Sequence, residues 1–304
     1  MSAQKKFCGV VVPMVSPFKD DFSVDTGAAE RITELLVTND VIPFVLGTTG
    51  EAHSMTSQQK EELVRAVIRV TDGRAQVFAG ITSNSLMDSI YQSGKYAEMG
   101  VTAVVSSIPF YYPINESQIL LYFEKLADAV PCPLILYNIP VTVKSSIPLE
   151  IIDKLSNHPN ISGVKDSEQN VERIDKSLNL WKNRTDFSYL LGWGAMSVYG
   201  LKKGADGIVP SAGNVIPGLH AELYQAVVHG DIEKAEKLQE RIQSVSKLYI
   251  ADRDLGQSLV ALKMLMYVKG LCGPEVLPPL FRMEPEEEQK FENTIRRNFE
   301  LLGV

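Results

Sequence analysis

The chain has 304 residues, of which 45% are hydrophobic and 22% are charged. This is the composition of an ordinary globular protein, and it suits one barrel of about 250 residues with an extension as well as two domains. The net charge is −7 and no run of Lys and Arg occurs, which excludes an extended surface for nucleic acid or anionic membranes.

Short apolar runs alternate with longer amphipathic stretches along the chain. Each run is rich in Val, Ile or Leu and lacks the period-two alternation of a half-buried strand. This pattern is typical of parallel strands that are buried on both faces. The runs begin at Gly9, Pro43, Gln76, Ala103, Pro133, Ser162, Ser188 and Gly207.

The stretches between the runs predict helices, among them residues 26–39, 57–71, 115–130 and 148–157. The second of these begins at Ser57, a candidate capping residue. Eight strands, each followed by a helix, predict parallel strands with right-handed crossovers. They favour a closed (β/α)8 TIM barrel, and an open doubly wound sheet is the second choice.

The predicted barrel occupies residues 1–224, and residues 225–304 contain helical patterns alone. Three helices are expected there, over residues 230–250, 255–270 and 284–302. They predict a C-terminal helical extension. Met264 and Met266 lie in an apolar helical stripe and are expected in the core.

Cysteine usage and hydropathy indicate the cellular compartment. Cys8, Cys132 and Cys272 are widely spaced and form no CxxC motif, which predicts buried free thiols in a reducing compartment. No segment approaches the roughly 18 uninterrupted apolar residues of a membrane span. We therefore expect a cytoplasmic protein without membrane contact.

Lys165 is the unusual residue of the sixth run. A lysine inside a barrel strand is costly unless it is neutral or paired. Burial favours the neutral amine, which is the form that attacks a ketone carbonyl. The alternative is a structural lysine paired with a carboxylate such as Asp166 or Glu51, and the lysine alone leaves both interpretations open.

Tyr137 ends the neighbouring fifth run and favours the chemical interpretation. In a (β/α)8 barrel the active site lies at the carboxyl ends of the strands, so its hydroxyl is expected near Lys165. Formation of a Schiff base needs a group that protonates the carbinolamine and helps to expel water, and a phenol can do this. The alternative is a core tyrosine bonded to the backbone.

The loop Gly47–Glu51, with the sequence GTTGE, follows the second run. Its glycines permit a tight turn with converging N–H groups, and Thr48 and Thr49 add hydroxyl donors. Such a loop suits a carboxylate, and the alternative is a plain strand-to-helix turn. Since the four histidines show no HExxH or HxH spacing, no zinc site is expected.

Several motifs, in order and spacing, resemble the dihydrodipicolinate synthase / N-acetylneuraminate lyase family of class I pyruvate-dependent aldolases. The resemblance covers nearly the whole chain. The motifs are GTTGE at 47–51, PFYYP at 109–113, YNIP at 137–140, GVK at 163–165 and GADGIV at 204–209.

The resemblance implies that Lys165 forms an imine with pyruvate and that Tyr137 is the proton donor and acceptor. Thr48 and Tyr111 would complete a hydroxyl relay, with Tyr111 reaching into the site of a neighbouring subunit. Thr48 and Thr49 would hold the pyruvate carboxylate. The family is usually a homotetramer, a dimer of dimers, and needs no organic cofactor or metal.

The resemblance also places Gly47, Gly192 and Val209 in the substrate pocket. Thr142 stands where the synthases carry an arginine for the carboxylate of aspartate semialdehyde, and Lys144 could replace that arginine if it turns inward. Gly194 and Ala195 stand where the N-acetylneuraminate lyases carry an Asp-Glu pair that binds the sugar hydroxyls.

These departures at Thr142, Gly194 and Ala195 predict a different second substrate. The expected activity is an aldolase that splits or makes a 2-keto-3-deoxy or 4-hydroxy-2-oxo acid, with pyruvate and a small aldehyde as substrates. Three alternatives are open: 4-hydroxy-tetrahydrodipicolinate synthase, a sugar-acid dehydratase, and a non-enzymatic sensor of 2-oxo acids.

Overall fold

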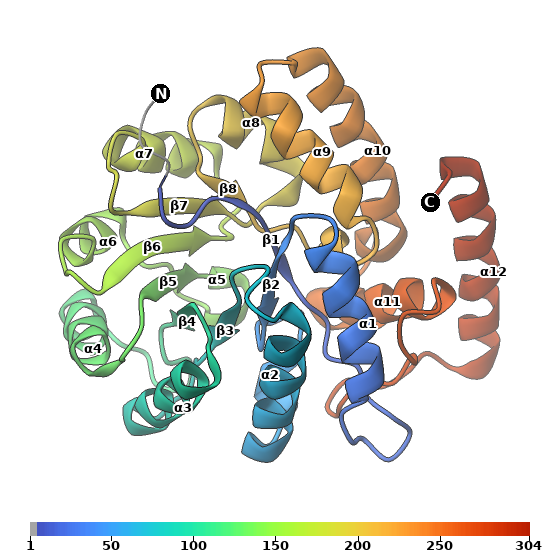
Figure 1. Ribbon diagram of the computed structural model, residues 1–304, viewed down its shortest axis with the longest axis horizontal. Coiled ribbons are helices and arrows are strands. Elements are labelled where there is room, and N and C mark those ends of the chain that lie inside the picture. The colour runs from blue at the N-terminus through green and yellow to red at the C-terminus, as the bar shows by residue number, and fades with distance from the viewer. Residues whose placement is uncertain (1–4) are drawn as a thin grey trace. The chain divides into compact units, whose positions relative to one another are not determined.

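The computed structural model describes residues 5–304 (Figure 1). Within these residues eight strands follow one another in the order of a closed barrel. This confirms the predicted (β/α)8 barrel with C-terminal helices, while residues 1–4 of the predicted barrel lie outside the described residues. The strands are β1 Gly9–Pro13, β2 Ile42–Val45, β3 Phe78–Gly80, β4 Ala103–Ser107, β5 Leu134–Asn138, β6 Ile161–Asp166, β7 Ser188–Leu191 and β8 Gly207–Ile208.

Helices follow the strands and then continue alone to the end of the chain. The α-helices are α1 Thr26–Val37, α2 Ser57–Thr71, α3 Leu86–Met99, α4 Glu116–Ala129, α5 Pro140–Val143, α6 Leu149–Leu155, α7 Val171–Trp181, α8 Ser197–Lys202, α9 Pro217–Val228, α10 Ile232–Ile250, α11 Leu255–Val268 and α12 Pro285–Leu302. Short 3-10 helices lie at Ala52–Ser54, Gly194–Met196 and Ser211–Asn214.

The start of α2 corrects one sequence expectation. Ser57 is the first helical residue, and the cap is Thr56, whose side chain accepts a hydrogen bond from the N–H of Gln59. The N–H of Thr56 in turn donates to Gln59 Oε1, which completes a capping box. Thr56 is favoured as the cap because only the residue that precedes the helix has the extended backbone that this reciprocal pair needs.

The chain divides into two compact units. The first unit holds the residues up to Val11 together with Gln76–Pro210, and the second holds Val12–Ala75 together with Ser211–Val304. The division into residues 1–224 and 225–304 stays a prediction, and its boundary falls within α9.

The first unit contains β3 to β8, which pair in parallel from each strand to the next. Its strands are almost wholly buried because helices cover their outer faces, and Figure 1 shows α4, α6 and α7 outside β5, β6 and β7. In the register between β5 and β6, Tyr137 lies opposite Lys165 and Asn138 lies opposite Asp166.

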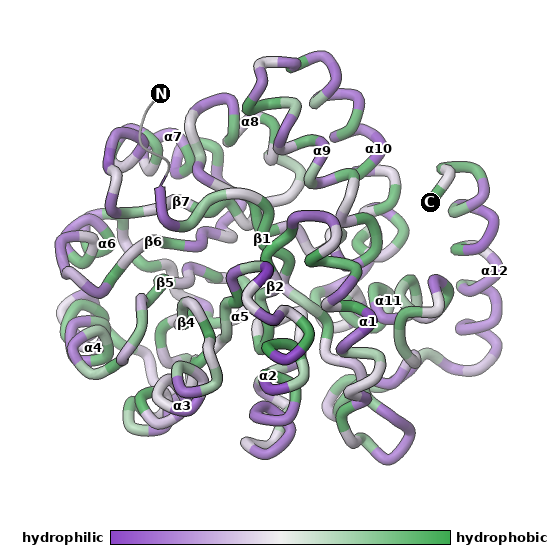
Figure 2. The backbone as a smooth tube through the Cα atoms, viewed as in Figure 1, coloured by the Kyte–Doolittle hydropathy of each residue, from purple (hydrophilic) through white to green (hydrophobic). Residues whose placement is uncertain are grey.

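The second unit contains β2, the helices α1 and α2, and the C-terminal helices. The apolar helix α11 is buried along most of its length, and the predicted core residues Met264 and Met266 are both buried. By contrast, α12 buries only Ile295 and Phe299, and Figure 2 shows hydrophilic colours along most of this helix.

Two of the three cysteines follow the sequence expectation. Within residues 5–304 all cysteines are free thiols, and Cys132 and Cys272 are buried. Burial raises the pKa of each of these two thiols to about 11. Cys8 is half-buried rather than buried, because it comes directly before β1 instead of inside it. No helix in the described part of the chain combines the length and the apolarity that crossing a membrane requires.

Candidate active site

Lys165 and Tyr137 lie side by side at the carboxyl ends of β6 and β5. Each is the second-last residue of its strand, and the strand register pairs them directly. The lysine Nζ lies 3.9 Å from the centre of the tyrosine ring. Both side chains are buried, with exposed fractions of 5% for Lys165 and 7% for Tyr137. The structure thus brings together the two residues that carry the predicted chemistry.

The two carboxylates that could have made Lys165 a structural lysine are bound to other cations. Asp166 Oδ2 accepts a hydrogen bond from Arg173 Nε at 2.6 Å. Glu51 Oε1 accepts one from Lys263 Nζ at 2.8 Å. Each of the two carboxylates named in the alternative for Lys165 thus has another cation as a partner.

Behind the two strand ends, four residues form a closed polar ring. Asn138 Nδ2 donates to Asp166 Oδ1 at 2.8 Å, and Arg173 Nε donates to Asp166 Oδ2. Arg173 Nη2 donates to the Ile147 carbonyl at 2.9 Å, and the Ile147 N–H donates to Asn138 Oδ1 at 2.9 Å. We call Asn138, Asp166, Arg173 and Ile147 the polar ring. All four are buried.

The polar ring was not predicted from the sequence. A signal for part of it was present, because Asn138 and Asp166 are polar residues directly after Tyr137 and Lys165 in runs that are otherwise apolar. Arg173 left no such signal, since a single arginine near the start of a helix is ordinary.

Charge and burial oppose each other at the ring. Burial raises the pKa of Asp166, although the Arg173 charge and the hydrogen bonds from Asn138 and Arg173 act in the opposite direction. Burial also acts to raise the pKa of Glu168, but hydrogen bonds from Ser146 and Asn138 and the Arg173 charge hold it below its ordinary value. Glu168 thus stays an anion beside Arg173.

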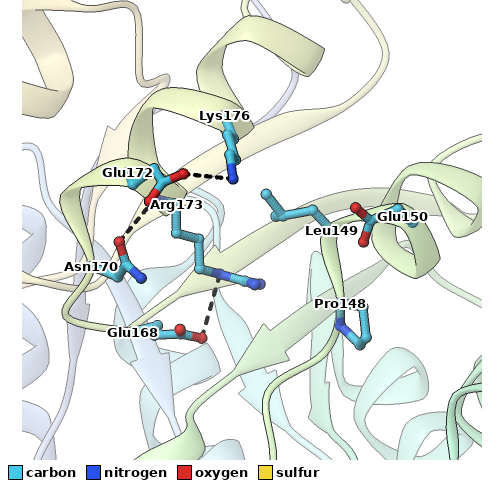
Figure 3. A pocket seen from close by; sticks show the side chains of 8 residues that line it. All are labelled: Pro148, Leu149, Glu150, Glu168, Asn170, Glu172, Arg173 and Lys176. Atoms are coloured by element: carbon cyan, nitrogen blue, oxygen red, sulfur yellow. Dashed lines mark hydrogen bonds and ion pairs between the residues drawn. The ribbon is translucent and has the colours of Figure 1, made fainter.

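A pocket of about 260 Å³ opens beside the ring, between the start of α6 and the start of α7. Figure 3 shows the Arg173 side chain reaching toward Glu168, with Pro148 and Leu149 on the facing wall. Arg173 is the only member of the polar ring among its lining residues, and Lys165 and Tyr137 do not line it.

Backbone hydrogen bonds from Gly192 and Val209 join the ends of β6, β7 and β8. The Gly192 N–H donates to the Asp166 carbonyl at 2.7 Å, and the Val209 N–H donates to the Leu191 carbonyl at 2.8 Å. A Cβ at Gly192 would clash with Ser167 Oγ and would lie 3.0 Å from the Asp166 carbonyl oxygen. Glycine is therefore required at this predicted pocket position because the chain after β6 approaches so closely.

Tyr111 lies on the surface of the described chain. Its exposed fraction is 72%, and its ring packs edge-on against Tyr112 at a centroid distance of 5.0 Å. Asn84 Oδ1 accepts the N–H groups of both Phe110 and Tyr111, which ties the loop down. The loop thus presents exposed aromatic rings on an ordered backbone.

The residues expected to select the second substrate are small or engaged locally. Thr142 lies in α5, and its hydroxyl donates to the Ile139 carbonyl at 3.2 Å. Lys144 ends α5 with a positive φ of 57°, and its Nζ donates to the Val141 carbonyl at 2.9 Å. Lys144 is exposed, so the inward turn that would let it replace an arginine is not observed.

In the second unit, Gly47–Glu51 forms a pair of overlapping turns after β2. The N–H of Gly50 donates to the Gly47 carbonyl, and the N–H of Glu51 donates to the Thr48 carbonyl, both at 3.1 Å. A Cβ at Gly50 would lie 2.9 Å from a backbone carbonyl, so this position requires glycine. Within residues 5–304, no acceptor takes the N–H or the hydroxyl of Thr48 or Thr49. Thr48 and Thr49 therefore offer four donors to a ligand.

Glu51 closes this loop and is part of a buried ion pair that the sequence analysis missed. Its carboxylate bonds Lys263 Nζ and the Leu277 N–H, the latter at 2.7 Å. Lys263 Nζ also donates to the carbonyls of Ser16 and Glu275, at 2.6 and 3.0 Å. The signal was a lysine within the apolar run of α11, which is the same kind of signal that identified Lys165.

A model of the dihydrodipicolinate synthetase family matches residues 6–298. The chain belongs to this family. Membership confirms the family that the motifs predicted, and it covers both compact units. Enzymes of the dihydrodipicolinate synthetase family are class I pyruvate-dependent lyases.

Relatives within the family have diverged far in sequence but little in fold. A 4-hydroxy-tetrahydrodipicolinate synthase of Staphylococcus saprophyticus is 30% identical over 94% of this chain and 95% of its own. An uncharacterized DapA-like lyase of Pyrococcus horikoshii is 30% identical over 92% of this chain and 96% of its own. The structure of dihydrodipicolinate synthase from Bacteroides thetaiotaomicron matches with a TM-score of 0.91 and 29% identity, over 97% of this chain and 99% of that one.

Proposed function

We propose that this protein is a class I aldolase that forms an imine between Lys165 and pyruvate. The observation that carries the proposal is the lysine Nζ at 3.9 Å from the Tyr137 ring, with both side chains buried on register-paired strands. A buried primary amine beside a phenol is the pair of groups that imine formation needs.

The reaction can be written with these two groups. The neutral Lys165 amine attacks C2 of pyruvate, and the ketone oxygen takes a proton to give a carbinolamine. The Tyr137 hydroxyl supplies the proton with which that oxygen leaves as water, and an imine remains. Loss of a C3 proton to the Tyr137 phenolate gives an enamine, whose C3 forms a bond to an aldehyde carbon while the aldehyde oxygen takes that proton and becomes the 4-hydroxyl. Hydrolysis then releases a 4-hydroxy-2-oxo acid, and the reverse sequence cleaves such an acid.

We assign the pyruvate carboxylate to Thr48 and Thr49. Their four donors have no protein acceptor in the described chain, and hydrogen bonds to a charged group are worth roughly 1.5–3 kcal/mol each. This local arrangement suits an anionic substrate on a chain whose net charge is −7. Gly47, Gly192 and Val209 complete the proposed pyruvate pocket.

The second substrate is proposed to be a small aldehyde, uncharged where it meets Thr142. The hydroxyl of Thr142 and the small residues Gly194 and Ala195 offer it no guanidinium or carboxylate. The second candidate function is 4-hydroxy-tetrahydrodipicolinate synthase, which acts on aspartate semialdehyde. The name of the Staphylococcus saprophyticus relative, at 30% identity, favours it.

Borohydride reduction in the presence of pyruvate tests the imine. The expected result is a reduced pyruvyl adduct on the peptide that contains Lys165, seen by mass spectrometry, and its loss in Lys165→Arg. An unmodified Lys165 peptide would reject the proposal. Turnover with a panel of neutral aldehydes, compared with aspartate semialdehyde, then decides between the two candidate functions. Release of water without an aldehyde product would indicate a dehydratase, and pyruvate binding without exchange of its methyl protons would indicate a sensor.

The proposed active form is a homotetramer, a dimer of dimers, in which Tyr111 serves a neighbouring subunit. The exposed rings of Phe110, Tyr111 and Tyr112 support this proposal, because exposed aromatic clusters are typical of protein interfaces. Sedimentation of the protein with and without Tyr111→Asp tests it. Sedimentation as a monomer before the substitution would contradict it.

A further inference from the structure

The polar ring lies one residue beyond the two proposed reactive side chains. Asn138 follows Tyr137 on β5, and Asp166 follows Lys165 on β6. Because side chains alternate along a strand, the two ring residues point away from the face that carries Tyr137 and Lys165. Each reactive residue is therefore joined by one peptide bond to a residue of the ring.

The ring joins the two strand ends more firmly than the strand ladder alone. The Asn138 amide and the Asp166 carboxylate bond directly at 2.8 Å, and the Ser167 N–H adds a bond to the Asn138 carbonyl at 2.9 Å. The Gly192 N–H bonds the Asp166 carbonyl on the other side. The end of β6, and with it the direction of Lys165, is therefore restrained from both edges, and the end of β5 is restrained from the side of β6.

Arg173 closes the ring from α7 and leaves Asp166 little freedom. Its Nε and Nη2 bond two different acceptors, the Asp166 carboxylate and the Ile147 carbonyl. Asp166 also accepts the Glu168 N–H at 3.0 Å. A carboxylate held by three donors in a buried setting cannot rotate without losing a charged hydrogen bond.

We propose that Asn138, Asp166 and Arg173 are positioning residues, which hold Tyr137 and Lys165 facing each other at the distance that imine formation needs. The inference rests on the proposed function for its chemical consequence, but the geometry that it assigns to the ring stands by itself. The ring affects the proposed reaction through the backbone of Tyr137 and Lys165, and not through contact with the substrate.

The test replaces Arg173 and compares the effect with that of replacing Arg184, an arginine that makes similar bonds. Arg184 lies beyond the opposite end of α7, where its guanidinium bonds Asp186 and the Ser156 carbonyl, both at 2.7 Å. Arg173→Met and Arg184→Met each remove an arginine that joins a carboxylate to a backbone carbonyl. Arg173→Lys keeps the positive charge but cannot bond the Asp166 carboxylate and the Ile147 carbonyl at once. It serves as a second variant in case Arg173→Met does not fold.

The first readout is the rate of imine formation at saturating pyruvate, from quenching with borohydride at timed intervals. We expect Arg173→Met to slow adduct formation on Lys165 about 100-fold, since a misplacement of about 1 Å has this effect on positioned groups. Arg173→Lys should slow it about 10-fold, and Arg184→Met should stay within about 2-fold. The KM for pyruvate should change little, because the proposed donors to the pyruvate carboxylate, Thr48 and Thr49, are not part of the ring. Equal rates in all four proteins would overturn the proposal, and so would an equal loss in Arg184→Met.

The second readout needs no chemistry. In a crystal structure of Arg173→Lys, the separation of Lys165 Nζ from the centre of the Tyr137 ring should exceed the native 3.9 Å by about half an ångström, in keeping with its smaller expected loss of rate. An unchanged separation would overturn the inference. If the native protein forms no imine, the proposed function fails, and this structural measurement still decides whether the ring positions the two side chains.

Discussion

Replacement of Lys263 by methionine would leave the Glu51 carboxylate buried without its cation. Both side chains are 1% exposed and lie 2.8 Å apart. Removal of one partner of a buried ion pair costs about 3–5 kcal/mol, because the remaining charge has lost its solvent and its counter-ion. Two backbone carbonyls, of Ser16 and Glu275, also lose their donor. We expect Lys263→Met to lower the free energy of unfolding by about 3–5 kcal/mol and Tm by roughly 10 °C.

Urea unfolding at pH 7, followed by circular dichroism, measures the loss. Two comparisons make it specific to the buried pair. Lys263→Met combined with Glu51→Gln removes both charges, so it should lose roughly half as much as Lys263→Met alone. Lys237→Met breaks an exposed pair with Glu233 on α10, which should cost under about 1 kcal/mol.

The reasoning would be refuted if Lys263→Met cost no more than Lys237→Met. It would be refuted equally if the double variant were as unstable as Lys263→Met, since the loss would then come from packing and not from the uncompensated charge of Glu51. Because Glu51 ends the loop that carries Thr48 and Thr49, Lys263→Met should also raise the KM for pyruvate.

Three further predictions test other parts of the chain. Thr48→Val and Thr49→Val each remove one hydroxyl donor, so each should raise the KM for pyruvate roughly 10- to 100-fold in steady-state assays and leave Tm unchanged. Gly163→Ala would bring a Cβ to 2.7 Å from the Ser188 carbonyl, between β6 and β7, so it should lower the free energy of urea unfolding by about 1–3 kcal/mol. Burial lowers the pKa of His220 to about 4, so this residue takes up a proton in the unfolded chain, but not in the native one, as pH falls below about 6.5. The native protein should lose about 2 kcal/mol between pH 7 and pH 5 that His220→Gln does not lose, and parallel pH profiles in urea would contradict this reasoning.

Local pattern predicted most of the fold and singled out the proposed reactive pair. Buried parallel strands read as apolar runs without alternation, and each of the eight runs overlaps a strand. Lys165 stood out because a charge inside such a run is costly. Lys263 in the apolar run of α11 carries the same signal, and the structure shows it in a buried ion pair with Glu51. A lysine in an apolar run therefore predicts burial, and its chemistry depends on what lies opposite.

The sequence by itself determined the barrel, the family motifs and the presence of a buried lysine at 165, because these depend on short-range hydrophobic pattern and residue type. The tertiary structure decided the partners. It set Lys165 opposite Tyr137, paired Asp166 with Arg173 and Glu51 with Lys263, and turned Lys144 toward a carbonyl of α5. Such pairings depend on strand register and on segments up to 212 positions apart in the chain. No local pattern encodes them, since a charged side chain takes the partner that the packed backbone brings within hydrogen-bond distance.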